Sequence, residues 1–533
     1  MGKFDCIEFI KTAERIREKA IIEKRMTLCN DTAELRKMAE QEEGIVKTKY
    51  NNLVIDSECF SRSAQFTKNS IDDEFGQDEL KLLKSCEEYL AKEELLSTDR
   101  IVGEPQNNIT VRLTVPKRYA HVAYGGGNIF TVPRSKIEKP TYEIIMFFDE
   151  EYEPNKTKPL PKKDITIRLA MLPDGRVVKI VRNSNYIGEY KKGVFASEDW
   201  NAKARRGGIF LHAGCREDYL QDADGEYRTI RSLLIALSAN GKTSTTSKIL
   251  ARKGEEKSWL VQDDGGTLMP DGSFHGFEGG GIFVKTDSVT PGDQIETYYG
   301  LLKPGTFGEN VHVTPDGDFD FFNVERTSNG RAVIKRDDFM HASQHISVPR
   351  VENLILITRG SIIPAIAKLS AAQAAALMVL GQSMESSAGD PTQAGKIRNE
   401  FFYDPFIAGD RTEHANLFYD ILSNLSHINC FLLNTGSIGE GEHYHDISLR
   451  HTMSILDSLI RKGLDQNWVR SETGFMVPKA IRDVDPIFMH PERLYSHSEF
   501  EERQKALNEI RCSVIEKYDN GKLHPDIKGI FKR

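Results

Sequence analysis

Residues 234–250 read LIALSANGKTSTTSKIL and pass from an apolar run into a Ser- and Thr-rich segment that reads as the start of a helix. Gly241, Lys242 and Thr243 complete the phosphate-loop pattern G-x-x-x-x-G-K-[ST], whose first glycine is replaced here by Ala236. In such a loop small residues let backbone N–H groups approach phosphate oxygens, the lysine is a cation for the β- and γ-phosphates, and the threonine hydroxyl serves Mg²⁺. Ala236 removes none of these functions, so the stretch predicts a phosphate loop, although Gly-Lys-Thr alone is weak evidence.

A pair of aspartates strengthens this interpretation. Residues 259–268 read WLVQDDGGTL, an apolar strand that ends in Asp263 and Asp264 about twenty residues after the loop. A carboxylate at the end of a strand is what Mg²⁺ on a phosphate-loop nucleotide requires. Two adjacent carboxylates indicate two cations, whereas the alternative, an Asp-rich turn, would require two coincidences.

The composition narrows the class of protein. The 533 residues are 39% hydrophobic and 28% charged, which is enough for two or three globular domains. A net charge of −8 argues against nucleic acid as the main partner, because phosphate backbones require clustered Lys and Arg. No apolar run approaches the ~20 residues of a membrane span, and the N-terminus has no signal-peptide core, so we expect no membrane partner. Seven scattered cysteines without C-x-x-C fit reduced thiols, and we expect a cytoplasmic location.

The periodicity of apolar residues predicts both helices and strands. Helical spacing is found at residues 3–48, 78–96, 371–380 and 501–517. Runs rich in β-branched and aromatic residues predict strands at 109–115, 142–148, 164–172, 177–181 and 354–358. Asp-Gly pairs predict hairpin turns at 174–175, 224–225, 271–272 and 316–317. The chain therefore reads as α/β with a strand-rich middle.

Two segments upstream of the loop carry further candidates. Residues 208–214, GIFLHAG, form a short apolar strand that ends in His212, and residues 186–195, YIGEYKKGVF, hold two lysines among apolar or small residues. Taken alone, a histidine at a strand end is usually structural, and paired lysines usually mark a solvated turn.

Together, in this order, the segments resemble the phosphoenolpyruvate carboxykinase family, most closely its ATP-type branch. That family carries Y-x-G-E-x-K-K-G-x-F, a His at a strand end, L-S-G-T-G-K-T-T, a D-D pair and an F-E-G-G strand. The similarity covers roughly residues 55–520 and is dense after 186. It continues in HGFEGGGIFVKTD (275–287), ENVHVTPDGDFDF (309–321), SNGR (328–331), LLNTGSIGEG (432–441), ISLRHTMSILDSL (447–459), VDPIFMHPERLY (484–495) and, earlier, CFSRSA (59–64).

The resemblance implies a two-lobed α/β fold with the active site in the cleft and the phosphate loop in the C-terminal lobe. We therefore expect a helical N-terminal extension at residues 1–50, a mixed substrate-binding lobe at 51–207, and a nucleotide- and metal-binding lobe at 208–533.

The same resemblance implies the metal ligands. Lys192, His212 and Asp264 would bind Mn²⁺, with the lysine as a neutral amine, because burial beside a dication lowers its pKa. Thr243 would hold Mg²⁺ of the nucleotide, with Asp263 nearby.

Substrate and nucleotide contacts are implied as well. Lys242 and Arg331 would neutralise charge on the transferred γ-phosphate and complete a catalytic set with Lys192, His212 and Asp263. Arg62 and Tyr186, together with Lys192 and Arg331, would orient the substrate carboxylate. The nucleotide would contact Leu237, Ser238, Ala239, Asn240, Gly241, Lys242, Thr243, Ser244, Glu309, Ile447 and Thr452.

Four departures from the family pattern bear on the acceptor. The family's D-D-E-H-G-W is DDGGTL here, and its L-S-G-T-G-K is LSANGK. Its lid, E-P-T-P-T-F-S-A-C-F-G, corresponds to the very different GDPTQAGKIRNEFFYDPF (389–406). Its arginine near adenine corresponds to Asp446, within EHYHD (442–446), where an aspartate should repel a triphosphate or accept from a base amino group. EHYHD is also a weak candidate for a metal cluster.

The implied reaction converts oxaloacetate and ATP (or GTP) into phosphoenolpyruvate, CO₂ and the nucleoside diphosphate. Its partners would be a small carboxylate and a nucleotide, and its cofactors Mg²⁺ and Mn²⁺. Two alternatives stay open: a kinase on the same scaffold with another small-molecule or protein acceptor, and a nucleotide-binding regulatory protein with little turnover. Arg62 opposite the phosphate loop would favour the small carboxylate, and the intact second-metal ligands argue against a mere binding module.

Overall fold

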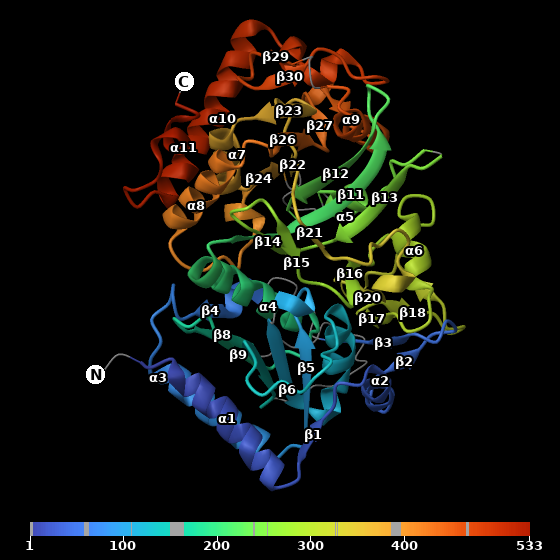
Figure 1. Ribbon diagram of the computed structural model, residues 1–533, viewed down its shortest axis with the longest axis vertical. Coiled ribbons are helices and arrows are strands. Elements are labelled where there is room, and N and C mark those ends of the chain that lie inside the picture. The colour runs from blue at the N-terminus through green and yellow to red at the C-terminus, as the bar shows by residue number, and fades with distance from the viewer. Residues whose placement is uncertain are drawn as a thin grey trace. The chain divides into compact units, whose positions relative to one another are not determined.

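Figure 1 shows the computed structural model of the chain, coloured from blue at the N-terminus to red at the C-terminus. The chain forms two compact units. The first contains Met1–Arg206 and Gly276–Ile346, and the second contains Gly207–His275 and Ser347–Arg533. The structure describes residues 4–57, 63–107, 109–149, 165–237, 240–252, 254–325, 327, 329–384, 396–464 and 468–532.

The main sheet of the first unit is mixed and largely buried. It contains both antiparallel and parallel pairs, and its central strands have nearly every residue buried, which suits their β-branched and aromatic composition. In the order in which they lie side by side, its strands are β1 (Met26–Leu28), β5 (Leu95–Ile101), β6 (Thr110–Pro116), β7 (Tyr142–Phe147), β9 (Val177–Arg182), β8 (Thr166–Met171) and β4 (Thr67–Asn69).

Helices α1 (Ile7–Ile22) and α3 (Gln77–Leu90) cover part of this sheet (Figure 1). Their apolar residues recur every three or four positions, so each helix presents one apolar stripe. Both stripes join one core cluster with residues of β7 and β9, such as Phe147 and Ile180.

A second sheet of the first unit joins distant parts of the chain. Its strands, in spatial order, are β16 (Gly281–Lys285), β20 (Arg331–Lys335), β17 (Phe307–Glu309), β3 (Leu53–Ile55) and β2 (Val46–Lys47). β17 pairs in parallel with β3, and this pairing is why the chain returns to the first unit after Gly276.

The remaining elements of the first unit are short, apart from the buried helix α4. They are α2 (Thr32–Glu40), α4 (Gly188–Asn201), α6 (Ile295–Leu301), β18 (His312–Val313), β19 (Phe319–Asp320), and the 3₁₀ or π turns Ser63–Phe66, Pro105–Asn107, Lys117–Tyr119, Val122–Gly126, Gly127–Ile129, Ala202–Arg206 and Arg336–Asp338.

The main sheet of the second unit carries the phosphate loop. Its middle is apolar, and Leu234, Ile355 and Leu433 share a core cluster with residues of α9 (Leu449–Ile460). In spatial order its strands are β13 (Lys257–Gln262), β11 (Ala213–Gln221), β12 (Tyr227–Ile235), β22 (Asn353–Thr358), β26 (Asn429–Asn434), β23 (Ile366–Leu369), β30 (Met476–Pro478) and β29 (Trp468–Arg470).

A smaller sheet of the second unit has the order β10 (Ile209–Leu211), β14 (Gly266–Leu268), β15 (Phe274–Gly276) and β21 (Ser347–Val348). Two short antiparallel pairs are β24 (Gln382–Met384) with β25 (Ile397–Asn399), and β27 (Ser437–Ile438) with β28 (His445–Asp446). The other helices and turns are α5 (Lys242–Ser247), α7 (Ala371–Leu380), α8 (Arg411–Asn424), α10 (His497–Tyr518), α11 (Pro525–Gly529), Phe401–Tyr403, Gly441–His443, Pro486–Met489 and Pro491–Leu494.

Much of this agrees with the sequence-based predictions. The predicted strands correspond to β6, β7, β8, β9 and β22, and the predicted helix 371–380 is α7. Every predicted Asp-Gly turn joins neighbouring strands and places its glycine at φ of 82–88°, a backbone conformation that glycine adopts without strain. The mixed α/β class is confirmed.

Two helix predictions were wrong in extent. Residues 3–48 are two helices, α1 and α2, separated by strand β1. The helix predicted at 78–96 ends at Leu90, and Leu95 and Leu96 begin β5, where both are fully buried. The charged residues at 92–94 form the turn, so the apolar pair belongs to a sheet rather than to the apolar stripe of the helix.

The division of the chain also differs from the expected one. The chain first passes from the first unit to the second after Arg206, next to the expected boundary. Residues 276–346, however, belong to the first unit rather than to a continuous C-terminal lobe. The first fifty residues are part of the first unit and not an extension, because α1 supplies Phe9 and Ile10 to its core.

Candidate active site

The phosphate loop of the second unit follows the end of β12. Strand β12 lies between β11 and β22 and ends in the fully buried Leu233, Leu234 and Ile235. Gly241 has φ of 86° and caps α5, whose first residue is Lys242. The expected strand, loop and helix are therefore present, and Ser238 and Ala239 lie outside the described residues.

Arg216 of β11 stabilises the short helix α5. Its guanidinium is fully buried, pairs with both carboxylate oxygens of Asp218, and donates to the carbonyl oxygens of Thr245 at 2.7 Å and Lys248 at 2.9 Å. These carbonyls are among those that a helix end leaves without partners. The arginine thus fixes the position of α5 and, with it, of the phosphate loop.

The loop is also attached to two further strands. The side-chain amide of Asn240 donates to the Ser383 hydroxyl of β24 at 2.8 Å. The hydroxyl of Thr435, which follows β26, donates to the Asn240 carbonyl at 2.9 Å. Asn240 is nearly fully buried, and its side chain is committed to the contact with Ser383.

Asp264 brings three of the predicted residues together. It follows β13, and its Oδ1 lies 2.8 Å from His212 Nε2, next to the end of β10. The ammonium of Lys242 donates to the same oxygen. Beside this group, the Thr243 hydroxyl lies 3.5 Å from Oδ2 of the buried Asp263.

The donor set at Asp264 fits a divalent cation. A carboxylate oxygen is a common ligand of Mn²⁺ and Mg²⁺, and an imidazole nitrogen is a common ligand of transition-metal ions. Here the two donors lie side by side, where the Lys242 ammonium already lies. The side chains of His212 and Asp264 keep 21% and 22% of their surface exposed, so a ligand can reach them.

The predicted adenosine contacts in the second unit are core residues. Ile447 and Thr452 are nearly fully buried, and the Thr452 hydroxyl donates to the Ser448 carbonyl of its own helix at 3.3 Å. Asp446 is exposed, and its charge interacts with that of Arg359. Burial lowers the pKa of Arg359, and the attraction of Asp446 opposes this shift. No motif in the sequence marks Arg359 as a neighbour of Asp446. Within the part of the chain that the structure describes, no three His, Cys, Asp or Glu side chains gather as a metal cluster, at EHYHD or elsewhere.

In the first unit, Tyr186 and Lys192 lie on one structural element. Both belong to the segment that enters helix α4, and the Lys192 ammonium lies 5.0 Å from the centre of the Tyr186 ring. The ammonium donates to Glu189 Oε1 at 3.2 Å and to the Ser63 hydroxyl at 3.0 Å. Contrary to the solvated turn that paired lysines usually mark, this segment is a buried helix.

Glu189 is a residue that the sequence analysis missed. Its carboxylate is 1% exposed and also accepts from Lys179 of β9 at 2.9 Å. Burial alone would raise the pKa of Glu189, but Lys179 and Lys192 lower it to about 2. Lys191 is paired similarly, with Glu278 at 2.8 Å. The sequence did contain a sign of this pair, because an acidic residue three positions before a lysine on a helix can pair with it.

Glu309 and Arg331 are neighbours across the pair β17–β20. Glu309 is fully buried, and its Oε1 accepts the backbone N–H of Ile187 at 2.9 Å. Burial raises the pKa of Glu309 to about 7, although its hydrogen bonds to Ser57 and Ile187 oppose this shift. Arg331 is partly exposed, and Arg62 lies outside the described residues.

Comparison with known proteins places these residues in a family. A family model described as phosphoenolpyruvate carboxykinase matches residues 7–486. The chain belongs to the phosphoenolpyruvate carboxykinase family. It is an enzyme of the carboxykinase type, and the phosphate loop, Asp263–Asp264 and His212 all lie within the matched range.

Its curated relatives carry the name phosphoenolpyruvate carboxykinase (ATP). The protein of Aeropyrum pernix is 26% identical over 475 residues, which cover 87% of this chain and 89% of the relative. The protein of Chelativorans sp. is 26% identical over 59% of this chain and 57% of its own length, and that of Mesorhizobium japonicum is 26% identical over 62% and 60%. None of the described helices is long and apolar enough to cross a membrane.

Proposed function

We propose that this carboxykinase-family enzyme converts oxaloacetate and ATP into phosphoenolpyruvate, CO₂ and ADP. The bond between the methylene carbon and its carboxylate breaks, CO₂ leaves, and the electron pair forms the enolate of pyruvate. The enolate oxygen then attacks the γ-phosphorus, and ADP departs. The observation that carries the proposal is the convergence of His212 and Lys242 on Asp264 beside a phosphate loop.

The second unit would bind the nucleotide. Lys242 begins α5 and would neutralise charge on the β- and γ-phosphates, while the backbone N–H groups around Gly241 would donate hydrogen bonds to phosphate oxygens. Thr243 would present its hydroxyl to Mg²⁺, with Asp263 accepting from a water of that ion. Asn240, held by Ser383 and Thr435, would keep the loop open for the phosphates.

His212 and Asp264 would hold Mn²⁺, as their converging donors support, and by resemblance Lys192 is proposed as a third ligand. When bound, the ion supplies a positive charge that stabilises the enolate oxygen. Lys192 donates to Glu189 in the structure, and as a metal ligand it would have to be a neutral amine whose lone pair faces the ion.

The first unit would bind the substrate. Tyr186 and Arg62 would orient the carboxylate of oxaloacetate, and Arg331 would face the transferred phosphate. Glu189 keeps Lys192 beside the Tyr186 ring, so the two side chains reach the substrate from one surface. A cytoplasmic location is proposed as well, since none of the described cysteines forms a disulfide.

The test is phosphorus NMR of the purified protein with Mg²⁺, Mn²⁺, ATP and oxaloacetate. A phosphoenolpyruvate signal should grow with the wild type and with His312→Ala, a control at an exposed histidine. His212→Ala should abolish the signal. If ATP binds without that signal, or if another acceptor is phosphorylated instead, the carboxykinase proposal fails and a kinase with a different acceptor takes its place.

A further inference from the structure

Two buried side chains hold the backbone on either side of Tyr186. The Nε2 atom of His121 lies 2.8 Å from the carbonyl oxygen of Asn185, and Glu309 Oε1 accepts the N–H of Ile187 at 2.9 Å. His121 and Glu309 are both 0% exposed. Neither side chain is exposed, and each makes a hydrogen bond with the backbone of the chain itself.

His121 is in turn held by Glu42. Its Nδ1 lies 2.6 Å from Glu42 Oε1, and its backbone N–H donates to Glu42 Oε2 at 3.0 Å. A carbonyl oxygen can only accept, so Nε2 carries a proton toward Asn185. The ring of Phe307 in β17 stacks on the imidazole at 6.3 Å with planes 11° apart, which fixes the ring orientation.

Glu309 is fixed by its strand. Strand β17 pairs with β3 on one side and with β20 on the other, so the position of the carboxylate follows from the sheet. The same strand therefore supplies Phe307 for His121 and Glu309 for Ile187.

The ring of Tyr186 cannot move independently of this backbone. A Cβ added to Gly188 would lie 2.1 Å from Tyr186 Cε1, so the ring packs directly on the first turn of α4. One turn further along the same helix, Lys192 lies above the ring. A shift of the backbone at residues 185–187 would thus displace both side chains.

We propose that Glu309 and His121 are positioning residues that hold residues 185–187 so that Tyr186 and Lys192 face the carboxylate substrate. The assignment rests on the proposed function, and it replaces the nucleotide contact that the family resemblance implied for Glu309. Both residues act through the backbone and touch neither substrate nor nucleotide.

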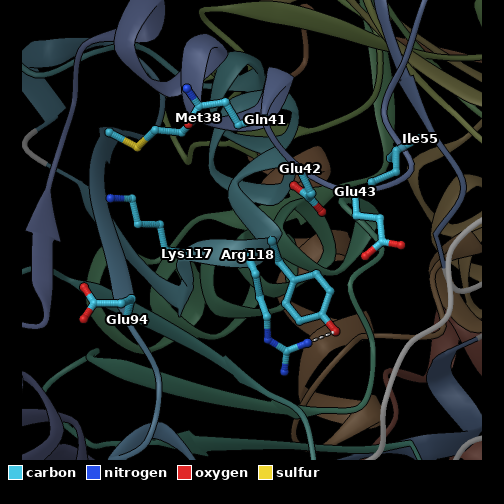
Figure 2. A pocket seen from close by; sticks show the side chains of 9 residues that line it. Met38, Gln41, Glu42, Glu43, Ile55, Glu94, Lys117 and Arg118 are labelled. Carbon is cyan, nitrogen blue, oxygen red and sulfur yellow. Dashed lines mark hydrogen bonds between the residues drawn. The ribbon is translucent and has the colours of Figure 1, made fainter.

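The pair Glu42–His121 is reached by solvent from one side. Glu42 lines an open pocket of about 380 Å³ in the first unit, and Figure 2 shows it on the side of the pocket opposite Glu94. Glu94 lines the same pocket without a bond to His121, and it provides a matched control. The pocket is lined by Met38, Gln41, Glu42, Glu43, Ile55, Glu94, Lys117, Arg118 and Tyr119.

The kinetic test compares variants of the two positioning residues. Glu309→Leu and His121→Leu should raise KM for oxaloacetate by about tenfold or more, because a misplaced binding group loses orientation, while KM for ATP stays within about twofold. Glu309→Gln should retain most of the wild-type KM, since its amide oxygen still accepts from Ile187. Glu94→Gln should resemble the wild type.

A second control separates positioning from general loss of a buried pair. His490 Nδ1 lies 2.8 Å from Glu492 Oε1 in the second unit, and both side chains are less than a tenth exposed. His490→Leu should lower the temperature of unfolding without raising KM for oxaloacetate. If it raises that KM as much as His121→Leu does, the proposal is wrong.

Hydrogen exchange followed by mass spectrometry gives a readout that needs no activity. Peptides spanning residues 185–192 should exchange at least about tenfold faster in Glu309→Leu and His121→Leu, and near the wild-type rate in Glu309→Gln. Unchanged exchange there, or a rise in KM for ATP alone, would identify Glu309 as a nucleotide contact and overturn the assignment.

If the wild type makes no phosphoenolpyruvate, the proposed function fails, and the exchange result alone decides whether these residues hold the segment. Where a leucine variant does not fold, Glu309→Ala and His121→Ala replace it in both measurements, with the same expected results.

Discussion

The phosphate-loop region of the second unit and the Tyr186–Lys192 region of the first place their charges in opposite ways. Around the loop, the side chains of His212 and Asp264 keep about a fifth of their surface exposed. In the first unit, Lys179 and Glu189 are 3% and 1% exposed and are paired with each other. Both regions are expected to serve one reaction, yet in the first unit the accessible Lys192, 18% exposed, rests on a pair of charges that is itself buried.

The difference indicates that the charged side chains of the two regions serve different purposes. Charges that stay accessible can exchange their protein partner for a ligand, as Lys242 can exchange Asp264 for a phosphate. Charges that are buried and paired cannot be separated without a large cost, so they fix the position of neighbouring groups. We therefore expect the second unit to supply binding groups, whereas the buried pairs of the first maintain its geometry.

The largest effect is expected from Lys242→Met. Loss of the cation at the phosphate loop should reduce the rate of phosphoryl transfer by about 10³-fold, because nothing else at the start of α5 offsets charge on the transferred group. The rate of phosphoenolpyruvate formation, measured in a coupled assay, gives the result. Lys257→Met, an exposed lysine of β13, is the control and should keep its rate. Equal rates for the two variants would remove the phosphate loop from the mechanism.

Glu189→Gln should produce the largest loss of stability. It leaves the buried Lys179 without a charged partner, and breaking such a pair costs about 3–5 kcal/mol. The urea midpoint, followed by circular dichroism, should fall clearly. An unchanged midpoint would show that the buried charges of the first unit do not maintain its structure.

Glu309→Gln should change how stability depends on pH. The pKa of Glu309 is raised from 4.5 to about 7 by burial, so the folded state holds the proton more tightly than the unfolded chain does. The stabilisation that this carboxyl group contributes, about 1–3 kcal/mol, is fully present below its pKa in the unfolded chain. It is lost as the pH rises through its pKa in the folded state. Thermal unfolding from about pH 5 to pH 8 should show a smaller decline in the variant than in the wild type. Parallel declines would contradict the raised pKa.

Asp264→Asn should have the smallest effect on stability. Its carboxylate is partly exposed, and ion pairs of this kind contribute less than about 1 kcal/mol. The urea midpoint should therefore stay near that of the wild type, in contrast to Glu189→Gln, while Mn²⁺ binding followed by electron paramagnetic resonance weakens. A stability loss as large as that of Glu189→Gln would erase the distinction between the two regions.

The same distinction explains what the sequence could predict. The loop, Asp263, Asp264 and His212 each follow a strand within a short, recognisable motif. The structure brings His212 and Asp264 together, as their predicted shared metal requires, and adds Lys242, which was predicted to contact phosphate instead. Local patterns also located β6, β7, β9 and the Asp-Gly turns, because period-two alternation and positive φ are properties of a few consecutive residues.

The first unit was harder to predict, because its pairs join residues far apart in the chain. The contact of His121 with Glu42 spans 79 positions, and that of Glu309 with Ile187 spans 122. Nothing in the local sequence around either residue marks its partner. Ile447 and Thr452 are nearly fully buried, and their contacts with the nucleotide stay predictions that rest on motif position.

The return of residues 276–346 to the first unit has a consequence for synthesis. Strand β3, at Leu53–Ile55, lies between β2 and β17, and β17 is not made until residue 309. At ribosomal rates β3 therefore waits on the order of tens of seconds with one edge uncovered. Over that interval the nascent chain carries an open edge strand, which is the kind of surface that chaperones protect from aggregation. The first unit of this enzyme is thus the first to begin synthesis but cannot complete its folding until most of the phosphate-loop region has already been translated.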